Sequence, residues 1–152
     1  MTTDDAADQH GQVDVIAVPG GIPSSCCTSF ASQGCSRLLR EHLEAGGTLY
    51  GGSAGAVLVG RDIAIASVAD SNDVGLEDFR GLNLLHDLDV LPHYTPDQEV
   101  TARRVAAESG RSVLCIPEVG GVVASARDPL RNVGPSSAYI VHPGHTENLE
   151  PA

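Results

Sequence analysis

The chain of 152 residues contains no lysine and no tryptophan, and aromatic residues are scarce, with two Phe and three Tyr. All nine basic residues are arginines, against 20 Asp and Glu, so the formal net charge is −11. A surface of this charge repels the phosphate groups of nucleic acids and of anionic membranes. We therefore expect neither a nucleic acid nor a membrane among the partners.

Long hydrophobic runs are also missing. No run approaches the roughly 20 apolar residues that span a bilayer, and Met1 to Asp5 lack the basic and apolar regions of a secretion signal. These absences predict a cytoplasmic protein. The polar, acidic residues 1–12 predict a disordered tail, residues 13–145 a single domain, and residues 146–152 a polar C-terminal tail.

The four cysteines form no C-x-x-C pair and show no zinc-finger spacing. Cys26 and Cys27 are adjacent, Cys35 stands alone, and Cys115 lies within the apolar run 113–116. We expect free thiols, with Cys115 serving as a small buried apolar residue.

A β-branched run, Val13–Val18, ends at Pro19-Gly20-Gly21, which predicts a buried parallel strand that enters a tight loop. Apolar residues spaced by three and four predict a helix over 36–45, closed by Gly46-Gly47. This helix returns the chain to a second strand at 48–50, and such crossovers imply a parallel sheet with helices on its faces. The other predicted elements are strands at 88–92 and 112–116, a helix at 97–108, and a closing antiparallel pair formed by 122–125 and 137–141.

The second strand runs into Gly51-Gly52-Ser53-Ala54-Gly55, which matches the pattern G-x-S-x-G. In a nucleophile elbow of this kind, small residues let the backbone pass close to itself while the serine Oγ projects toward solvent. The helix that follows directs backbone N–H groups at the same point, where they would stabilise an anion. The alternative interpretation is a glycine-rich turn with an incidental serine, because short motifs match by chance.

Ser53, His93 and Glu118 each follow a predicted strand, and the carboxyl ends of parallel strands share one edge of a sheet. A serine nucleophile needs a base, and the base needs an acid that fixes its tautomer, so the three residues fit these roles. The alternatives are a polar loop histidine and a solvated loop carboxylate, and Asp70 and Asp73 compete with Glu118 for the third role. The sequence places the other histidines in tails (His10, His145), on an exposed helix face (His42) or in turns (His86, His142).

Four motifs between residues 13 and 143 occur in a specific order: a strand ending at Gly20-Gly21, then Tyr50-x-x-Ser53-Ala54-Gly55-Ala56, then Gly81-Leu82-Asn83-Leu84 leading to Pro92-His93-Tyr94, then Ile116-Pro117-Glu118. This order resembles the peptidase E or aspartyl dipeptidase family, which includes the cyanophycinases and has the class I glutamine amidotransferase-like fold. The resemblance implies an α/β three-layer sandwich with a mostly parallel sheet. It also implies a domain shortened at the N-terminus, because the family's strand–helix units before the Gly-Gly strand are missing.

The resemblance assigns roles as well. Ser53 resembles the family's nucleophile, His93 its general base and Glu118 the acid that orients the histidine, and no cofactor or metal is implied. The oxyanion donors would be backbone N–H groups of Gly20, Gly21 and Ala54. The related amidotransferases carry a cysteine at the elbow, so the serine indicates hydrolysis rather than amide transfer.

Substrate-binding roles are implied for Tyr94, Arg103 and Arg104. Family members that cut after an N-terminal aspartate place an arginine on the helix after the histidine, although Thr101 competes for the matching position. A departure from the family is Ile22-Pro23, which stands where an asparagine usually follows the Gly-Gly pair.

The leading functional hypothesis is a serine peptidase that acts on small peptides, with a preference for N-terminal Asp. The alternative is a truncated member, inactive or weakly active, that binds a small molecule or a protein. A third hypothesis is an assembly-dependent fragment, in which a homodimer covers the apolar flank left beside Val13–Val18.

Overall fold

The computed structural model describes residues 13–21, 33–68 and 79–152. The predicted tail 1–12, residues 22–32, Asp70 and Asp73 therefore lie outside the described residues. The helical elements are α3 (Gln33–Glu44), α4 (Ala54–Val59), η2 (Ile63–Val68), η3 (Pro96–Gln98) and α5 (Glu99–Ser109). The strands are β1 (Val15–Val18), β2 (Thr48–Gly51), β3 (Asp89–Pro92), β4 (Val113–Ile116), β5 (Val122–Val123), β6 (Arg131–Asn132), β7 (Ala138–Val141) and β8 (Thr146–Leu149).

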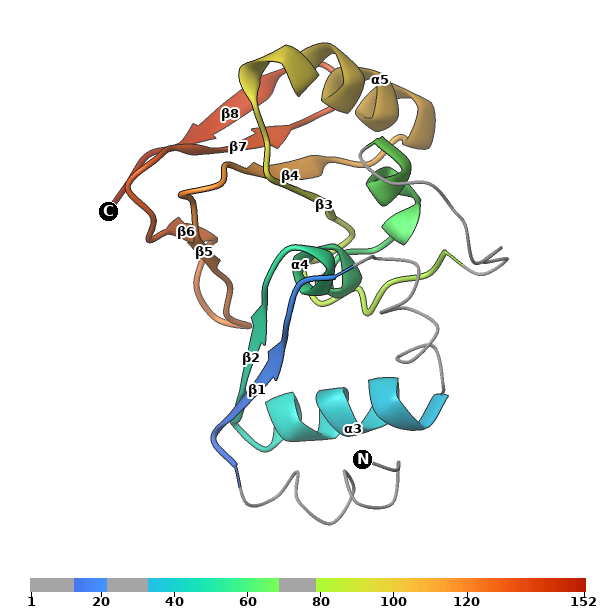
Figure 1. The fold of residues 1–152 in the computed structure, drawn as a ribbon, viewed down its shortest axis with the longest axis vertical. Coiled ribbons are helices and arrows are strands. Elements are labelled where there is room, and N and C mark those ends of the chain that lie inside the picture. Colours follow the sequence, from blue (N-terminus) through green and yellow to red (C-terminus); the bar gives the residue numbers. More distant parts are fainter. Residues whose placement is uncertain (1–12, 22–32, 69–78) are drawn as a thin grey trace.

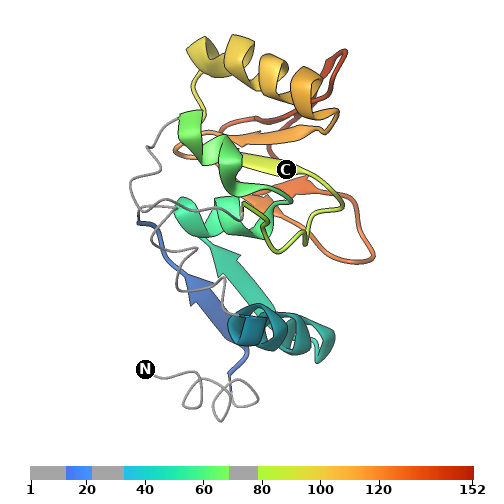
Figure 2. The ribbon, with the colours of Figure 1, turned by 90° about the vertical axis from the view of Figure 1, so that its right-hand side faces the viewer.

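The fold is α/β, as predicted, and its parallel pairs are the ones that carry the candidate site. β1 pairs with β2 and β3 pairs with β4, both in parallel, and β7 and β8 extend the second sheet in antiparallel fashion. Figures 1 and 2 both show α4 between the β1–β2 pair and this four-stranded sheet, and α4 contacts β2 and β3. Helix α5 covers the opposite side of the four-stranded sheet, and α3 packs against β2.

The parallel strands do not form the single continuous sheet that the sequence predicted. Within the described ranges, β1–β2 and β3–β4–β7–β8 are separate hydrogen-bonded sheets. The turn after α4 explains part of this separation, because the N–H of Arg61 donates to the carbonyl of Leu88 immediately before β3. Helix α4 thus joins the two parallel pairs through its packing rather than through a shared ladder.

The predicted closing pair of 122–125 with 137–141 is wrong. β5 pairs with β6, whereas β7 pairs with β4 and with β8. The buried side chain of Asn132 explains the β5–β6 hairpin, since its Nδ2 donates to the carbonyls of Ser136 and Leu149 at 2.8 and 2.9 Å. A buried amide that satisfies two separate backbone carbonyls fixes the position of both segments.

Residues 146–149, expected to belong to a polar tail, form strand β8 at the edge of the sheet. An edge strand with a solvent-exposed side does not need apolar residues, and Glu147 and Asn148 in β8 are exposed. Its backbone pairing with β7, from Val141 opposite Thr146 to Ala138 opposite Leu149, forms the strand without a hydrophobic pattern.

His42 was expected on an exposed helix face but is buried, with 3% of its surface exposed. A Cβ on Gly47 would lie 2.2 Å from atoms of the imidazole ring, so the glycine leaves the room that the ring occupies. Nε2 lies 3.2 Å from the carbonyl oxygen of Thr48. The glycine pair that ends α3 therefore also accommodates this histidine beneath β2.

The core combines residues from both parallel pairs with α3, α4 and α5, among them Val18, Leu39, Leu58, Leu91 and Val113. Cys115 is fully buried, as predicted, and burial raises the pKa of its thiol to about 12. In contrast, Val15 at the start of β1 is 55% exposed, and Val13, two residues before it, is 45% exposed.

Over the described ranges, no helix is both long enough and apolar enough to cross a membrane.

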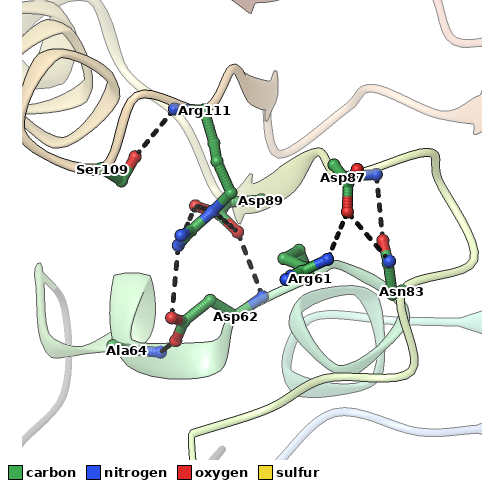
Figure 3. Close-up of polar contacts among 8 residues, drawn as sticks. All are labelled: Arg61, Asp62, Ala64, Asn83, Asp87, Asp89, Ser109 and Arg111. Atoms are coloured by element: carbon green, nitrogen blue, oxygen red, sulfur yellow. Dashed lines mark hydrogen bonds and ion pairs between the residues drawn. The ribbon is translucent and has the colours of Figure 1, made fainter.

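A charged network fixes the amino end of β3 (Figure 3). Asp89 is 1% exposed, and its Oδ2 accepts a hydrogen bond from Arg111 Nη2 at 3.0 Å. Arg111 also donates to Asp62 at 3.2 Å, and the Asp62 N–H donates to Asp89 Oδ1 at 3.1 Å. Burial raises the pKa of the Asp89 carboxyl, and the hydrogen bond from Arg111 opposes this shift. The network holds β3 in place from the end opposite to His93.

Candidate active site

Ser53 lies on a strained turn between β2 and α4, with φ 49° and ψ −112°. The flanking glycines make this turn sterically possible. A Cβ on Gly55 would lie 2.2 Å from the carbonyl oxygen of Val18, and one on Gly51 would lie 2.7 Å from the carbonyl oxygen of Gly55. A non-glycine residue in such a conformation costs about 1–3 kcal/mol and is found preferentially at functional sites. The predicted strand–elbow–helix geometry is therefore present.

The Gly20-Gly21 loop after β1 approaches the serine closely. A Cβ on Gly20 would lie 3.0 Å from Ser53 Cβ and 3.6 Å from Ser53 Oγ. Within the described part of the chain, the N–H groups of Gly20, Gly21 and Ala54 donate to no other residue. Gly20 approaches Ser53 and Ala54 follows it in the chain, so backbone N–H groups that no described residue uses lie beside the serine.

His93 follows β3 directly and also has a positive φ, of 56°. The next residue, Tyr94, anchors the turn because its N–H donates to the carbonyl of Ile116 at 3.0 Å, at the end of β4. The imidazole remains 54% exposed, and its Nε2 lies 2.8 Å from Ser53 Oγ. The fold thus places a histidine within hydrogen-bond distance of the elbow serine although 40 residues separate them.

Glu118 lies in the turn after β4, which is closed by the Gly120 N–H donating to the Pro117 carbonyl at 2.8 Å. Its Oε2 contacts Nδ1 of His93, the ring nitrogen that faces away from the serine. A carboxylate in this position accepts the Nδ1–H and leaves Nε2 free to accept the serine proton. Ser53, His93 and Glu118 therefore form one hydrogen-bonded chain, and the side chains of His93 and Glu118 are open to solvent.

The other predicted substrate-binding residues are Tyr94, Arg103 and Arg104, and among the described residues their side chains form no hydrogen bond with Ser53, His93 or Glu118. Tyr94 is 8% exposed and packs in the core, with its ring centroid 5.7 Å from that of Tyr139, and burial raises the pKa of its hydroxyl. The side chain of Tyr94 is thus mostly enclosed by the core, because the strand end that exposes His93 turns the next residue inward.

The two arginines of α5 form ion pairs along the helix. Arg103 Nη2 lies 2.8 Å from Glu99, and Arg104 Nη1 lies 3.4 Å from Glu108. Arg104 lines a hollow with Asp89 and Arg111 at the amino ends of β3 and β4, whereas His93 and Glu118 follow the carboxyl ends. Strands of four residues separate these ends by about 10 Å, so this hollow lies at the opposite end of the strands from His93 and Glu118.

Tyr50, which the sequence placed in a strand and in the family motif but gave no role, also borders the site. Tyr50 is 61% exposed, and a Cβ on Gly52 would lie 3.2 Å from its hydroxyl oxygen. The alternation of a strand gives the signal, because residues 50 and 52 lie on the same face and Ser53 follows at once.

Comparison with known proteins identifies a family for this chain. The model of peptidase family S51 matches residues 2–125. The chain belongs to this family. Among S51-like sequences, an uncharacterized peptidase of Listeria monocytogenes is 36% identical over 105 residues, which cover 66% of this chain and 51% of the relative. An uncharacterized peptidase of Pasteurella multocida is 34% identical over 90 residues, covering 58% and 43% of the two chains.

Solved structures support the glutamine amidotransferase-like fold of this S51 chain. A Listeria monocytogenes protein described as a peptidase E aligns with a TM-score of 0.73 and 26% identity, over 90% of this chain and 67% of its own. A peptidase from an acI-B1 actinobacterium aligns with a TM-score of 0.74 and 19% identity, over 98% and 62% of the two chains. The chain spans about half the length of the curated relatives that it matches.

Proposed function

We propose that this chain is a serine-type peptidase that hydrolyses small peptides, with Ser53 as nucleophile, His93 as general base and Glu118 as the acid that orients the histidine. The observation that carries the proposal is the 2.8 Å contact between His93 Nε2 and Ser53 Oγ, continued from His93 Nδ1 to Glu118. Membership of a peptidase family supports the reaction type. The strained φ at both Ser53 and His93 supports it independently.

In the acylation step, Ser53 Oγ attacks the carbonyl carbon of the peptide bond while His93 Nε2 accepts its proton. The carbonyl oxygen becomes an oxyanion, which the N–H groups of Gly20, Gly21 and Ala54 would stabilise. The tetrahedral intermediate then loses the amine, which receives the proton from His93 as the C–N bond breaks. An acyl ester on Ser53 remains.

In the deacylation step, water takes the place of the departed amine. His93 accepts a proton from the water as its oxygen attacks the ester carbonyl, and returns a proton to Ser53 Oγ as the C–O bond breaks. Glu118 stabilises the imidazolium in both steps because its carboxylate accepts the Nδ1–H. The products are the amine released in the first step and a carboxylic acid.

For the substrate, we propose a short peptide with an acidic N-terminal residue, bound by Arg103. A guanidinium group matches a carboxylate in bidentate geometry, and Arg103 lies on the helix that begins shortly after His93. The net charge of −11 opposes an acidic substrate at long range. A local arginine is therefore the feature that an acidic preference would require.

The test is a serine-directed fluorophosphonate, with the labelled residue identified by mass spectrometry, combined with turnover of Asp-, Glu- and Ala-initiated dipeptides. Exclusive labelling of Ser53 together with cleavage would support the proposal. A protein that binds these peptides but neither cleaves them nor reacts with the reagent would instead be a binding module. Labelling and cleavage without preference for Asp would leave the peptidase and remove the acidic specificity.

A further inference from the structure

Tyr50 occupies an unusual position for a strand tyrosine. It is the third residue of β2 and 61% of its surface is exposed, the largest exposed fraction among the large hydrophobic side chains of the described strands. Its ring lies against Gly52, since a Cβ there would be 3.2 Å from the hydroxyl oxygen and 3.3 Å from a ring carbon. Gly52 directly precedes Ser53, so the phenol lies beside the elbow.

Packing does not account for this placement. A tyrosine that serves the core buries its ring and gives its hydroxyl a hydrogen-bond partner, as the buried Tyr94 packs its ring against Tyr139. No described residue forms a hydrogen bond with the Tyr50 hydroxyl. The neighbouring side chains on this face of the β1–β2 pair, Val15, Ala17 and Thr48, are exposed and carry no charge.

Two glycines shape the surroundings of the elbow. Gly20 approaches Ser53 within contact distance. Gly52 has no side chain, and the Tyr50 ring partly fills the space that this leaves. The space above Gly52 is therefore bordered by an aromatic ring, by a hydroxyl group that bonds to none of the described residues, and by the backbone that carries the candidate nucleophile. An aromatic ring provides rigid apolar contact area, and its hydroxyl provides a hydrogen-bond donor at the outer end.

We infer that Tyr50 is a substrate-positioning residue of this site. Its ring covers one side of the bound peptide, and its hydroxyl donates a hydrogen bond to a carbonyl or carboxylate oxygen of that peptide. This inference rests on the proposed peptidase function and adds to it a residue that contacts substrate without taking part in bond making or breaking. Because the contact is the same in the ground state and in the transition state, its loss raises KM and leaves kcat nearly unchanged.

The experiment compares Tyr50→Phe, which removes only the hydroxyl, with Tyr50→Ala, which removes the ring. Thr48→Val is the matched control, because Thr48 is exposed on the same face of β2 but lies two residues farther from the elbow. Turnover of a dipeptide panel gives kcat and KM, and the rate of Ser53 labelling by a small fluorophosphonate reports the nucleophile without the peptide contact. Thermal melts report folding.

We expect Tyr50→Phe to raise KM about three- to tenfold, the loss that one net hydrogen bond produces, and Tyr50→Ala to raise it further. Both should label at the wild-type rate, and Thr48→Val should behave as wild type. If the wild-type protein cleaves peptides and labels at Ser53 while KM is unchanged in both Tyr50 variants, the inference is overturned and the peptidase function stands. Equal losses in kcat, labelling rate and melting temperature would show a structural role and would also overturn it. A wild-type protein that neither labels nor cleaves would remove the peptidase function and this inference together.

Discussion

His93 Nε2 lies 2.8 Å from Ser53 Oγ although the two residues follow strands that belong to separate hydrogen-bonded sheets. Helix α4 makes this possible, since it begins directly after Ser53 and packs against β3, the strand that ends before His93. Both residues have positive φ angles, which turn their side chains out of the strand direction and toward each other. The relationship depends on this pair of turns and on the packing of one short helix.

Ser53→Ala should reduce kcat for peptide hydrolysis by at least about a thousandfold, because no oxygen remains to form the acyl ester. Folding should be retained, since the side chain is small and lies at the surface of the elbow. Ser137→Ala serves as the control, because it also removes a serine hydroxyl, one that donates to Glu150 and belongs to no part of the candidate site. Near-native turnover by the Ser53 variant would show that the nucleophile lies elsewhere.

Glu118→Gln should lower kcat by about 10²- to 10⁴-fold with little change in melting temperature. The amide can still accept the Nδ1–H, but it does not stabilise the imidazolium. The side chain is 75% exposed, so its replacement disturbs little packing. Asp70→Asn and Asp73→Asn should have far smaller effects, and a larger loss in either would transfer the third role to that aspartate.

Arg103→Gln should raise KM for Asp-initiated dipeptides about tenfold and leave Ala-initiated ones unchanged, because it removes the charge that we propose for the acidic side chain. Arg104→Gln is the matched control, since Arg104 is the next residue on the same helix and lines a hollow at the opposite end of the strands from His93. Added salt should lower KM of the wild type for acidic substrates by screening the net charge of −11. Equal effects of the two substitutions would argue against specific recognition by Arg103.

Arg111→Gln should lower the free energy of unfolding by about 3 kcal/mol at pH 7, because it leaves the buried carboxylate of Asp89 without its charged partner. The pKa of Asp89 is already raised by burial and should rise further in this variant. A raised pKa means that the folded state holds a proton that the unfolded state releases. Stability is therefore greater below the ordinary carboxyl pKa and falls as the pH rises through the raised value.

Urea unfolding between pH 4 and pH 7 should accordingly show a smaller deficit for Arg111→Gln at the acidic end. Arg61→Gln is the control, because Arg61 pairs with Asp87 in the separate cluster drawn beside this network in Figure 3, and that pair is exposed to solvent and contributes little to stability. A deficit that does not depend on pH would indicate that Arg111 stabilises the fold through packing and not through Asp89.

The sequence by itself was sufficient to predict the strand–elbow–helix around Ser53, the parallel pairs, the helix ends at glycines and the burial of Cys115. These features depend on local rules: a β-branched run forms a strand, and only glycine fits beside the serine turn at positions 51 and 55. The strand-end positions of His93 and Glu118 also followed from the hydrophobic pattern.

Tertiary structure alone decided which candidates meet. The contacts of His93 with Ser53 and Glu118 depend on side-chain directions at positive φ, and no sequence period encodes these directions. The burial of Tyr94 and His42 and the pairing of the polar strand β8 are likewise set by long-range packing. Local sequence fixes the conformation of a segment, but the partner of a side chain depends on residues distant in the chain, and their relative position exists only after folding.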